Sequence, residues 1–365
     1  DLGAMTLRVS HRPHGVMAVL GPFNFPAHLP NGHIIPALIA GNTVVLKPSE
    51  QSPAVAEMMV RLWEMAELPG GVVNLVQGAR EPAQHLVSHD DVNGVLFTGG
   101  VQAGTAIHRA LAGQPQKILA LELGGNNPLV VWDAADVQSA ARIAVKSAFI
   151  GGGQRCTCAR RLVLKAGPEG DAVVEALGRM MDGLRVGAPD AEDQPFYGAL
   201  INSEAVDNVL EAQNTLADAG GEIIRAASRT NDGGAFVRPG LMDVTTVANR
   251  PDEEIFGPFL QIICVENFEE AIAEANNTRF GLAAGLVSDD ADKFETFARD
   301  VHAGILNWNR QTTGASGAAP FGGPGLSGNH RPAGYYAADY SAWPMANLIA
   351  AGAAKDEEVL PGMPE

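Results

Sequence analysis

The segment Gly153-Gln154-Arg155-Cys156-Thr157-Cys158 places a thiol directly after a glycine-rich turn and beside a cation. The thiolate is the reactive form of cysteine, and a nearby positive charge favours that form. A position on a turn also gives an electrophile access to the sulfur. We therefore predict that Cys156 is a nucleophile that bonds covalently to its substrate, and that Arg155 lowers the pKa of its thiol.

The three cysteines of the chain allow two other interpretations. A zinc site needs four ligands, and no second Cys or His pair lies at suitable spacing from Cys156 and Cys158. A buried structural thiol is the common case for an isolated cysteine, and Cys264, within the apolar run 260–265, fits it. We expect Cys158 to point away from the site of Cys156, or to be a neighbour without a catalytic role.

Two more polar residues follow apolar runs that are typical of strands. Glu122 ends the run 118–121, where a carboxylate is costly unless it is paired or used; the alternative is an exposed residue at a strand end. Asn24, in the rigid turn 21–26, either caps that turn or donates its amide to an oxyanion. Because open α/β sheets carry their sites at the carboxyl ends of strands, both positions favour a function.

The segment 97–104 follows another apolar run and opens a helical pattern. This is the context in which helix N-terminal amides bind phosphate. The spacing is not the usual G-x-G-x-x-G, however, and a plain tight turn explains the segment equally well. Lys47-Pro48-Ser49-Glu50 ends a further strand and, taken alone, is most simply an exposed turn.

The elements that must position these residues alternate between short apolar runs and amphipathic stretches. We predict strands at 15–20, 43–47, 72–76, 92–97 and 118–121, with helices at 29–40, 52–68, 81–88 and 101–111. In a second series, we predict strands at 129–131, 161–164, 260–265 and 282–287, with helices at 137–149, 170–184, 203–219, 268–275 and 291–301. Strands that alternate with helices of this size indicate βαβ units and parallel sheets.

The composition limits the classes of function. A chain of 365 residues is too long for one ordinary core and fits two domains with a small third element. Acidic residues outnumber basic ones by 42 to 25, which argues against nucleic acid and against anionic membrane surfaces as partners. No apolar run has the length of a membrane span, the first residues do not resemble a signal peptide, and the few cysteines favour a reduced, cytoplasmic setting over an exported one.

In their order along the chain, these motifs resemble the aldehyde dehydrogenase superfamily over residues 8–345. Two further motifs complete the set, Glu253-Glu254-Ile255-Phe256-Gly257-Pro258 and Pro320-Phe321-Gly322-Gly323 with Ser327-Gly328. The resemblance implies an α/β fold with a Rossmann-like parallel-sheet cofactor domain, an α/β catalytic domain and a small oligomerisation element. The implied boundaries are 1–13 for part of an oligomerisation hairpin, 14–122 for the NAD-binding domain, 123–318 for the catalytic domain, and 319–365 for a C-terminal return with an oligomerisation strand and tail.

The resemblance also implies a role for each motif residue. Cys156 is similar to the nucleophile, Glu122 to the general base, and Asn24 to the oxyanion donor that acts with the backbone N–H of Cys156. The residues similar to those that hold NAD are Lys47 and Glu50 at the adenosine ribose, Gly99, Gly100, Val101, Gln102, Ala103 and Gly104 at the pyrophosphate, and Glu254 and Phe256 at the nicotinamide ribose and ring. No metal is implied. The family usually has Ser at the position of Gly100, so one hydroxyl contact to phosphate is expected to be missing.

The implied activity is NAD-dependent oxidation of an aldehyde to a carboxylate through a thioester on Cys156. The implied partners are a small aldehyde and further copies of the chain, in a homodimer or a dimer of dimers. Family members usually carry roughly a hundred more residues, the length of a small domain, ahead of the point where this chain begins. We therefore expect a truncated chain that lacks the first part of its cofactor domain.

Several long stretches are most similar to a branch of the superfamily that acts on an acidic semialdehyde: 30–33, 121–128, 153–161, 307–309 and 327–332. Because the protein is strongly acidic, an acidic substrate needs local basic groups. Arg155 and Arg310 are the candidates to hold its carboxylates, although a solvated loop residue explains Arg310 equally well. Arg161 is expected in a structural ion pair.

Three alternatives remain open at this point. The first is a dehydrogenase for another semialdehyde, such as that of succinate or glutamate. The second is a CoA-acylating member, against which Glu122 argues. The third is a non-catalytic structural protein built on the same fold, against which the intact set of Cys156, Glu122 and Asn24 argues.

Overall fold

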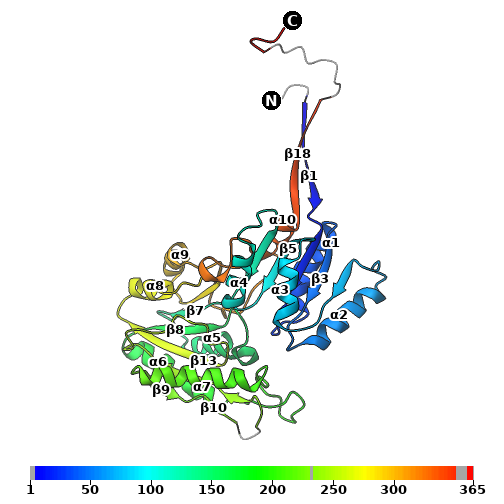
Figure 1. Cartoon of the computed structure of the whole chain (residues 1–365). Helices are drawn as coiled ribbons and strands as arrows, with labels where there is room; N and C mark the ends of the chain where they lie inside the picture. Colours follow the sequence, from blue (N-terminus) through cyan, green and yellow to red (C-terminus); the bar gives the residue numbers. More distant parts are fainter. Residues whose placement is uncertain (1–4, 231–232, 351–359, 365) are drawn as a thin grey trace.

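The computed structural model describes residues 5–230, 233–350 and 360–364. Within them, a parallel sheet with the strand order β4-β3-β2-β5-β6 occupies the N-terminal third of the chain (Figure 1). Its strands are β2 (Val16–Leu20), β3 (Thr43–Lys47), β4 (Val73–Leu75), β5 (Val92–Thr98) and β6 (Ile118–Glu122). The helices that connect them are α1 (His28–Ile39), α2 (Pro53–Met65), α3 (Arg80–Ser88) and α4 (Val101–Leu111).

Helices cover both faces of this sheet because its strands are apolar along most of their length. On one face, Ile34 of α1 and Met59 of α2 pack in a cluster with β2 and β3. On the other face, Leu86 of α3 and Leu111 of α4 pack in a cluster with β5 and β6. The strand order reverses between β2 and β5, so the loops that follow these two strands flank a topological switch point, where open α/β sheets bind their ligands.

A second sheet has the order β15-β14-β7-β8-β13-β12-β9 and is parallel except where β9 meets β12. Its strands are β7 (Asn127–Val131), β8 (Ala159–Lys165), β9 (Glu222–Arg225), β12 (Gly240–Asp243), β13 (Phe259–Val265), β14 (Ala283–Val287) and β15 (Ile305–Trp308). Its helices are α5 (Val137–Phe149), α6 (Pro168–Asp182), α7 (Ser203–Asp218), α8 (Phe268–Asn276) and α9 (Ala291–Asp300). Leu162 of β8 faces α5 and α6, whereas Val163 faces α8 and α9, as the alternation of a strand requires.

A two-stranded antiparallel ribbon projects from the rest of the molecule (Figure 1). It pairs β1 (Met5–Pro13) with β18 (Ala342–Ala350), and apolar side chains such as Leu7 and Leu348 are exposed on it. The strand expected within 1–13 is therefore present from residue 5. Residues 1–4 and most of the expected C-terminal tail, 351–359 and 365, lie outside the described residues.

The shorter elements are β10 (Ser228–Arg229), β11 (Val237–Arg238), β16 (Pro320–Phe321), β17 (Ala333–Gly334), α10 (Ala337–Ser341) and the 3-10 turns η1 (Ile150–Gly153) and η2 (Gly325–Ser327). The structure confirms the predicted α/β class and the parallel sheets. In the C-terminal return, the short helix α10, which the sequence did not predict, precedes the strand β18. The sequence prediction also lacked β9 to β12, which are too short to show a clear period. In the described part of the chain, no helix combines the length and the apolar character of a membrane span.

Candidate active site

Cys156 lies on the connection between α5 and β8, after the turn η1. Gly151, Gly152 and Gly153 have φ values of 63°, 66° and 71°, a left-handed conformation that glycine adopts without strain. A Cβ atom on Gly153 would lie 2.1 Å from the carbonyl oxygen of Gly257. The glycines therefore form a tight turn, in which the loop that carries Cys156 packs closely against the loop that contains Gly257.

The backbone around Cys156 is fixed by Asn127, the first residue of β7. The Asn127 Nδ2 atom donates to the carbonyl oxygens of Cys156, at 2.7 Å, and of Cys158, at 2.8 Å. Its Oδ1 atom accepts from the N–H of Ala283 at 3.0 Å. The side chain of Cys158 is buried, with Sγ 3.9 Å from the carbonyl oxygen of Ile150. No pattern in the sequence pointed to Asn127 as a positioning residue.

The charges around the Cys156 thiol differ from those expected. Burial, followed by the charges of Glu254 and Glu122, raises the pKa of Cys156 to about 12, and Arg160 opposes this increase. The guanidinium of Arg155 lies instead over the ring of Phe25, 5.2 Å from its centre. The predicted lowering of the thiol pKa by Arg155 is therefore wrong for this structure, and the thiol needs a base in order to react.

Glu122 is the last residue of β6 and is buried, with 4% of the residue exposed. Its Oε1 atom accepts from the N–H of Ala333 at 3.1 Å, and its Oε2 atom has no hydrogen-bond partner among the described residues. Burial raises the pKa of Glu122 well above its usual range, despite the bond from Ala333. A buried carboxyl group with an unpartnered oxygen is suited to accept a proton from a water molecule or a substrate.

Asn24 follows β2 and joins that loop to the nucleophile loop. Its Nδ2 atom donates to the carbonyl oxygen of Gln154 at 3.0 Å, and its Oδ1 atom accepts from the N–H of Phe25 at 3.1 Å. The oxygen of the amide is therefore engaged, whereas one of its two N–H groups is left to donate to a ligand. The structure thus gathers the loops of Asn24, Glu122 and Cys156 around one site.

The start of α4 lies at the carboxyl end of β5, within the predicted cofactor segment. Val101, Gln102 and Ala103 form its first turn, where backbone N–H groups have no partner within the helix. Gly100 is exposed, and a Cβ atom there would meet nothing within 4 Å, so glycine is not required by packing. Gly104 differs, because a Cβ atom there would lie 2.5 Å from a methyl group of Leu123.

Gly99 and the pair of Lys47 and Glu50 complete this edge of the sheet. The N–H of Gly99 donates to the carbonyl oxygen of Glu122 at 3.0 Å, which continues the pairing of β5 with β6. Lys47 Nζ lies 3.4 Å from Glu50 Oε2. The Lys47 side chain is buried and that of Glu50 is 52% exposed, so Glu50 is the member of the pair that faces solvent.

Glu254 and Phe256 lie on the loop that leads into β13. The Oε1 atom of Glu254 is 3.4 Å from Nη2 of Arg160, and burial raises the pKa of the Glu254 carboxyl group against the opposing charge of Arg160. The ring of Phe256 packs edge-on against Phe23 at 5.8 Å, and the guanidinium of Arg160 lies 5.4 Å from its centre. The sequence predicts a structural ion pair for the neighbouring Arg161. It assigns no role to Arg160.

A cavity of about 350 Å³ opens beside the nucleophile loop. Its walls combine apolar side chains, among them Phe23, Phe25 and Leu200, with polar ones, and Arg155 is a cation on its lining. Arg310 is exposed on the loop after β15 and does not line this cavity. The structure therefore does not bring the two predicted carboxylate anchors together there.

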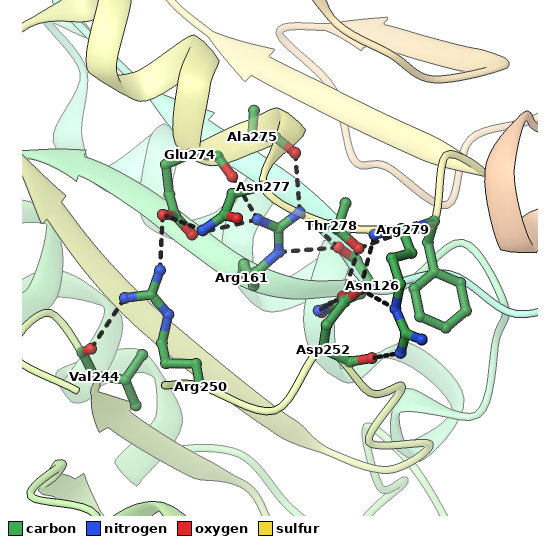
Figure 2. A network of polar contacts seen from close by, with 11 residues as sticks. Asn126, Arg161, Val244, Arg250, Asp252, Glu274, Ala275, Asn277, Thr278 and Arg279 are labelled. Atoms are coloured by element: carbon green, nitrogen blue, oxygen red, sulfur yellow. Dashed lines mark hydrogen bonds and ion pairs between the residues drawn. The ribbon is translucent and has the colours of Figure 1, made fainter. Parts of the chain in front are cut away.

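Arg161 belongs to a polar network on the other side of β8 (Figure 2). Its guanidinium donates to the carbonyl oxygen of Asn126 at 2.9 and 3.0 Å and lies 3.4 Å from Oε1 of Glu274, which confirms the expected structural ion pair. Asp252 accepts from the side chain of Asn126 at 2.9 Å. The network thereby ties the loop after β6 to the segment that leads to Glu254.

The chain is similar to known proteins along almost its whole length. The aldehyde dehydrogenase family matches residues 3–343. N-succinylglutamate 5-semialdehyde dehydrogenase of Serratia proteamaculans is 53% identical over 99% of this chain and 73% of that protein, and N-succinylglutamate 5-semialdehyde dehydrogenase 1 of Caulobacter vibrioides is 57% identical over 94% and 72%. A solved NAD-dependent aldehyde dehydrogenase from Sinorhizobium meliloti superposes with a TM-score of 0.89 at 30% identity, over 96% of this chain and 69% of that one. The chain belongs to the aldehyde dehydrogenase family and has its fold.

Proposed function

We propose that this protein oxidises N-succinyl-L-glutamate 5-semialdehyde to N-succinyl-L-glutamate, a step of arginine catabolism, with NAD as the cofactor. The identity of 53% and 57% to dehydrogenases of that name, over nearly the whole chain, supports the substrate. The observation that carries the chemistry is that Asn24 and Glu122 both lie near the loop of Cys156, next to a cavity that Asn24 and Arg155 line.

Cys156 is the proposed nucleophile. Its thiolate attacks the aldehyde carbonyl, and the oxygen that becomes negative is held by the second N–H of Asn24 together with the backbone N–H of Cys156. Asn24 is preorganised for this role, because its bonds to Gln154 and Phe25 fix the plane of the amide. NAD, when bound, supplies the hydride acceptor, and loss of hydride from the adduct leaves a thioester on Cys156.

Glu122 is the proposed base for the second half of the reaction. It takes a proton from water, and the resulting hydroxide attacks the thioester and releases the carboxylate product. Its raised pKa favours this role because a stronger base removes a proton from water more readily. The product is a free acid, which distinguishes this reaction from transfer of the acyl group to CoA.

The residues at the switch point suit a dinucleotide. The exposed first turn of α4 offers unpaired N–H groups to a pyrophosphate, and Glu50 faces solvent at the carboxyl end of β3, where it would accept bonds from ribose hydroxyls. Glu254 and Phe256 would hold the nicotinamide ribose and ring close to Cys156. The space around Gly100 would accept the serine that the family usually has at this position. Without the serine hydroxyl, NAD loses one contact to phosphate, which weakens its binding and does not block it.

The proposed substrate carries carboxylates, and the cavity carries Arg155. A guanidinium that rests on Phe25 rather than on a carboxylate remains available to a bound anion. The formal net charge of the whole chain is −17, so this local cation must hold the substrate against an unfavourable overall field.

The proposed organisation follows the sheets. We propose boundaries at 14–122 for the NAD-binding domain and 123–318 for the catalytic domain, with β1 of the segment 1–13 and β18 of the segment 319–365 as the oligomerisation ribbon. Exposed apolar residues on β1 and β18 support assembly through the ribbon, into a homodimer or a dimer of dimers. The scarcity of cysteine supports a cytoplasmic location.

The test is NADH formation by the full-length protein with N-succinylglutamate semialdehyde, succinate semialdehyde, glutamate semialdehyde and a neutral aldehyde of similar length. We expect the highest kcat/KM with the succinylated substrate and a free carboxylate as the product by mass spectrometry. A higher kcat/KM with another aldehyde would overturn the substrate. A CoA-dependent reaction that yields a CoA thioester would overturn the hydrolytic step.

A further inference from the structure

Arg160 is a fully buried cation between the nucleophile loop and the loop of Glu254. Its Nη1 atom donates to the carbonyl oxygens of Gly153 at 2.7 Å and Gly257 at 3.2 Å. Its Nη2 atom donates to the carbonyl oxygen of Arg155 at 3.1 Å and to Glu254 Oε1 at 3.4 Å. One side chain therefore joins the backbone just before Cys156 to the carboxylate proposed to hold the cofactor ribose.

The charge of Arg160 acts on two acids. It opposes the effect of burial on the pKa of Glu254, and it opposes the combined effect of burial, Glu254, Glu122 and Cys158 on the pKa of Cys156. A buried guanidinium is costly unless its charge is compensated. The bond to Glu254 is long, at 3.4 Å, and Nε of Arg160 has no partner among the described residues. The cation is thus only partly neutralised by its ion pair.

We propose that Arg160 is a positioning residue that divides its charge between Glu254 and the Cys156 thiolate, so that hydroxyl groups bound to Glu254 activate the nucleophile. The proposal rests on the proposed function, in which Glu254 holds the nicotinamide ribose. Hydroxyl donors on Glu254 compete with Arg160 for the carboxylate, and the charge of Arg160 is then available to the sulfur. The thiol proton passes to a solvent water molecule, because Cys156 is partly exposed, and Glu122 remains available for the later attack of water on the thioester.

This arrangement makes the thiol unreactive until the cofactor is in place. Without hydroxyl donors on Glu254, the carboxylate and the thiol share one cation, and burial keeps the sulfur protonated. A thiol that stays protonated is protected from oxidation and from stray electrophiles. When Glu254 binds the hydroxyl groups of the cofactor ribose, the charge of Arg160 favours the thiolate form of Cys156.

The test is the rate at which iodoacetamide alkylates Cys156 across pH, measured by mass spectrometry on the full-length protein with and without NAD. The readout needs no aldehyde, so its failure is distinct from failure of the proposed substrate. We expect Arg160→Gln to raise the pH midpoint by about one unit or more and to slow alkylation near neutral pH by about tenfold. Arg160→Lys retains the charge and should restore most of the rate. Arg299→Gln, which removes an exposed arginine of α9, should match the wild type.

Two further comparisons make the proposal specific. Glu254→Gln should lower the midpoint, because the thiolate no longer shares Arg160 with a carboxylate. NAD should lower the midpoint of the wild type and leave that of Glu254→Gln unchanged. A folded Arg160→Gln variant with the wild-type midpoint would overturn the proposal. If Arg160→Gln does not fold, Glu254→Gln decides, and a midpoint equal to that of the wild type would overturn it.

Discussion

The two sides of the active site are built in different ways. On the cofactor side, Glu50 and Gly100 are exposed and make few contacts within the protein. On the nucleophile side, Glu122, Asn127 and Arg160 are buried, and Asn127 and Arg160 bind backbone carbonyl groups of the loop that carries Cys156. An exposed charge is screened by water and contributes little, whereas a buried polar group is costly if its partner is removed. Substitutions should therefore have large effects on the nucleophile side and small effects on the cofactor side.

The largest effect is expected at Cys156. Cys156→Ala removes the atom that forms the thioester, and oxidation should fall to the background rate, whereas Cys158→Ala and Cys264→Ala should retain most of the activity. Cys158 is a matched control, because it lies two residues away and its thiol is buried against a carbonyl oxygen. NADH formation measures the activity. Preferential modification of Cys158 by a stoichiometric thiol reagent, read by mass spectrometry, would refute the assignment.

Glu122→Gln should slow hydrolysis of the thioester more than its formation. Because hydride transfer precedes the step that needs the base, we expect a burst of NADH followed by turnover at least about a hundredfold slower than in the wild type. Stopped-flow absorbance measures both phases. If the burst disappears together with turnover, Glu122 acts before hydride transfer.

The same substitution has a consequence for stability. The pKa of Glu122 is raised in the folded protein above its ordinary value of 4.5, so the folded state binds more protons than the unfolded state between the two values. Stability contributed by this group is present at low pH and is lost as pH rises through that window. Glu122→Gln should therefore raise the melting temperature relative to the wild type by an amount that grows with pH. A difference that is independent of pH would show that burial of the charge is not its cause.

The third effect separates Arg161 from Arg160, which are adjacent on β8. Arg161→Met removes the cation of a buried ion pair (Figure 2). The carbonyl oxygen of Asn126 loses its hydrogen bonds from the guanidinium, and Glu274 loses this ion-pair partner. We expect a loss of roughly 3–5 kcal/mol in the free energy of unfolding, measured by urea denaturation. In protein that remains folded, the pH midpoint of Cys156 alkylation should be unchanged. A shifted midpoint would show that the two arginines are not functionally distinct.

The fold and the three proposed catalytic residues could be predicted from sequence because each leaves a local pattern. Apolar runs alternate with amphipathic stretches, and Cys156 stands in a glycine-rich motif. The short strand β9 left no such pattern, because four residues are too few to establish a period. In the same way, the five residues of α10 are too few to show a helical period.

The supporting polar residues could not be predicted, because their roles depend on contacts between distant segments. Asn127 is separated from Ala283 by 156 residues along the chain, and Arg160 from Glu254 by 94. The charge next to the nucleophile in sequence was also misleading, since Arg155 turns toward Phe25, whereas it is the charge of Arg160 that lowers the pKa of the thiol. The signal for Arg160 was a pair of adjacent arginines at the start of a strand, where alternation puts Arg160 and Arg161 on opposite faces.

A smaller effect is expected from Arg155, which lines the cavity. Loss of one charge-assisted contact costs roughly 1.5–3 kcal/mol, so Arg155→Gln should lower kcat/KM for the succinylated semialdehyde by about ten- to hundredfold. A neutral aldehyde of similar length should lose much less. Arg310→Gln removes the same charge outside the cavity and should have little effect on either substrate. Equal losses on both aldehydes for Arg155→Gln would show that Arg155 is not a carboxylate anchor.

The smallest effect concerns the choice between NAD and NADP on the exposed side. The wild type should have a higher kcat/KM with NAD, because the charge of Glu50 repels a 2′-phosphate and its oxygens accept bonds from the ribose hydroxyls. Lys47, 3.4 Å away, partly compensates this charge, and water screens the exposed carboxylate. An exposed pair of charges is worth about 0.2–1 kcal/mol, so Glu50→Gln should reduce the preference for NAD by roughly two- to fivefold. Glu57→Gln, which removes an exposed carboxylate of α2, should leave the ratio unchanged. A wild type that prefers NADP would contradict the role of Glu50, and a loss far above tenfold would show that the cofactor side is as tightly coupled as the nucleophile side.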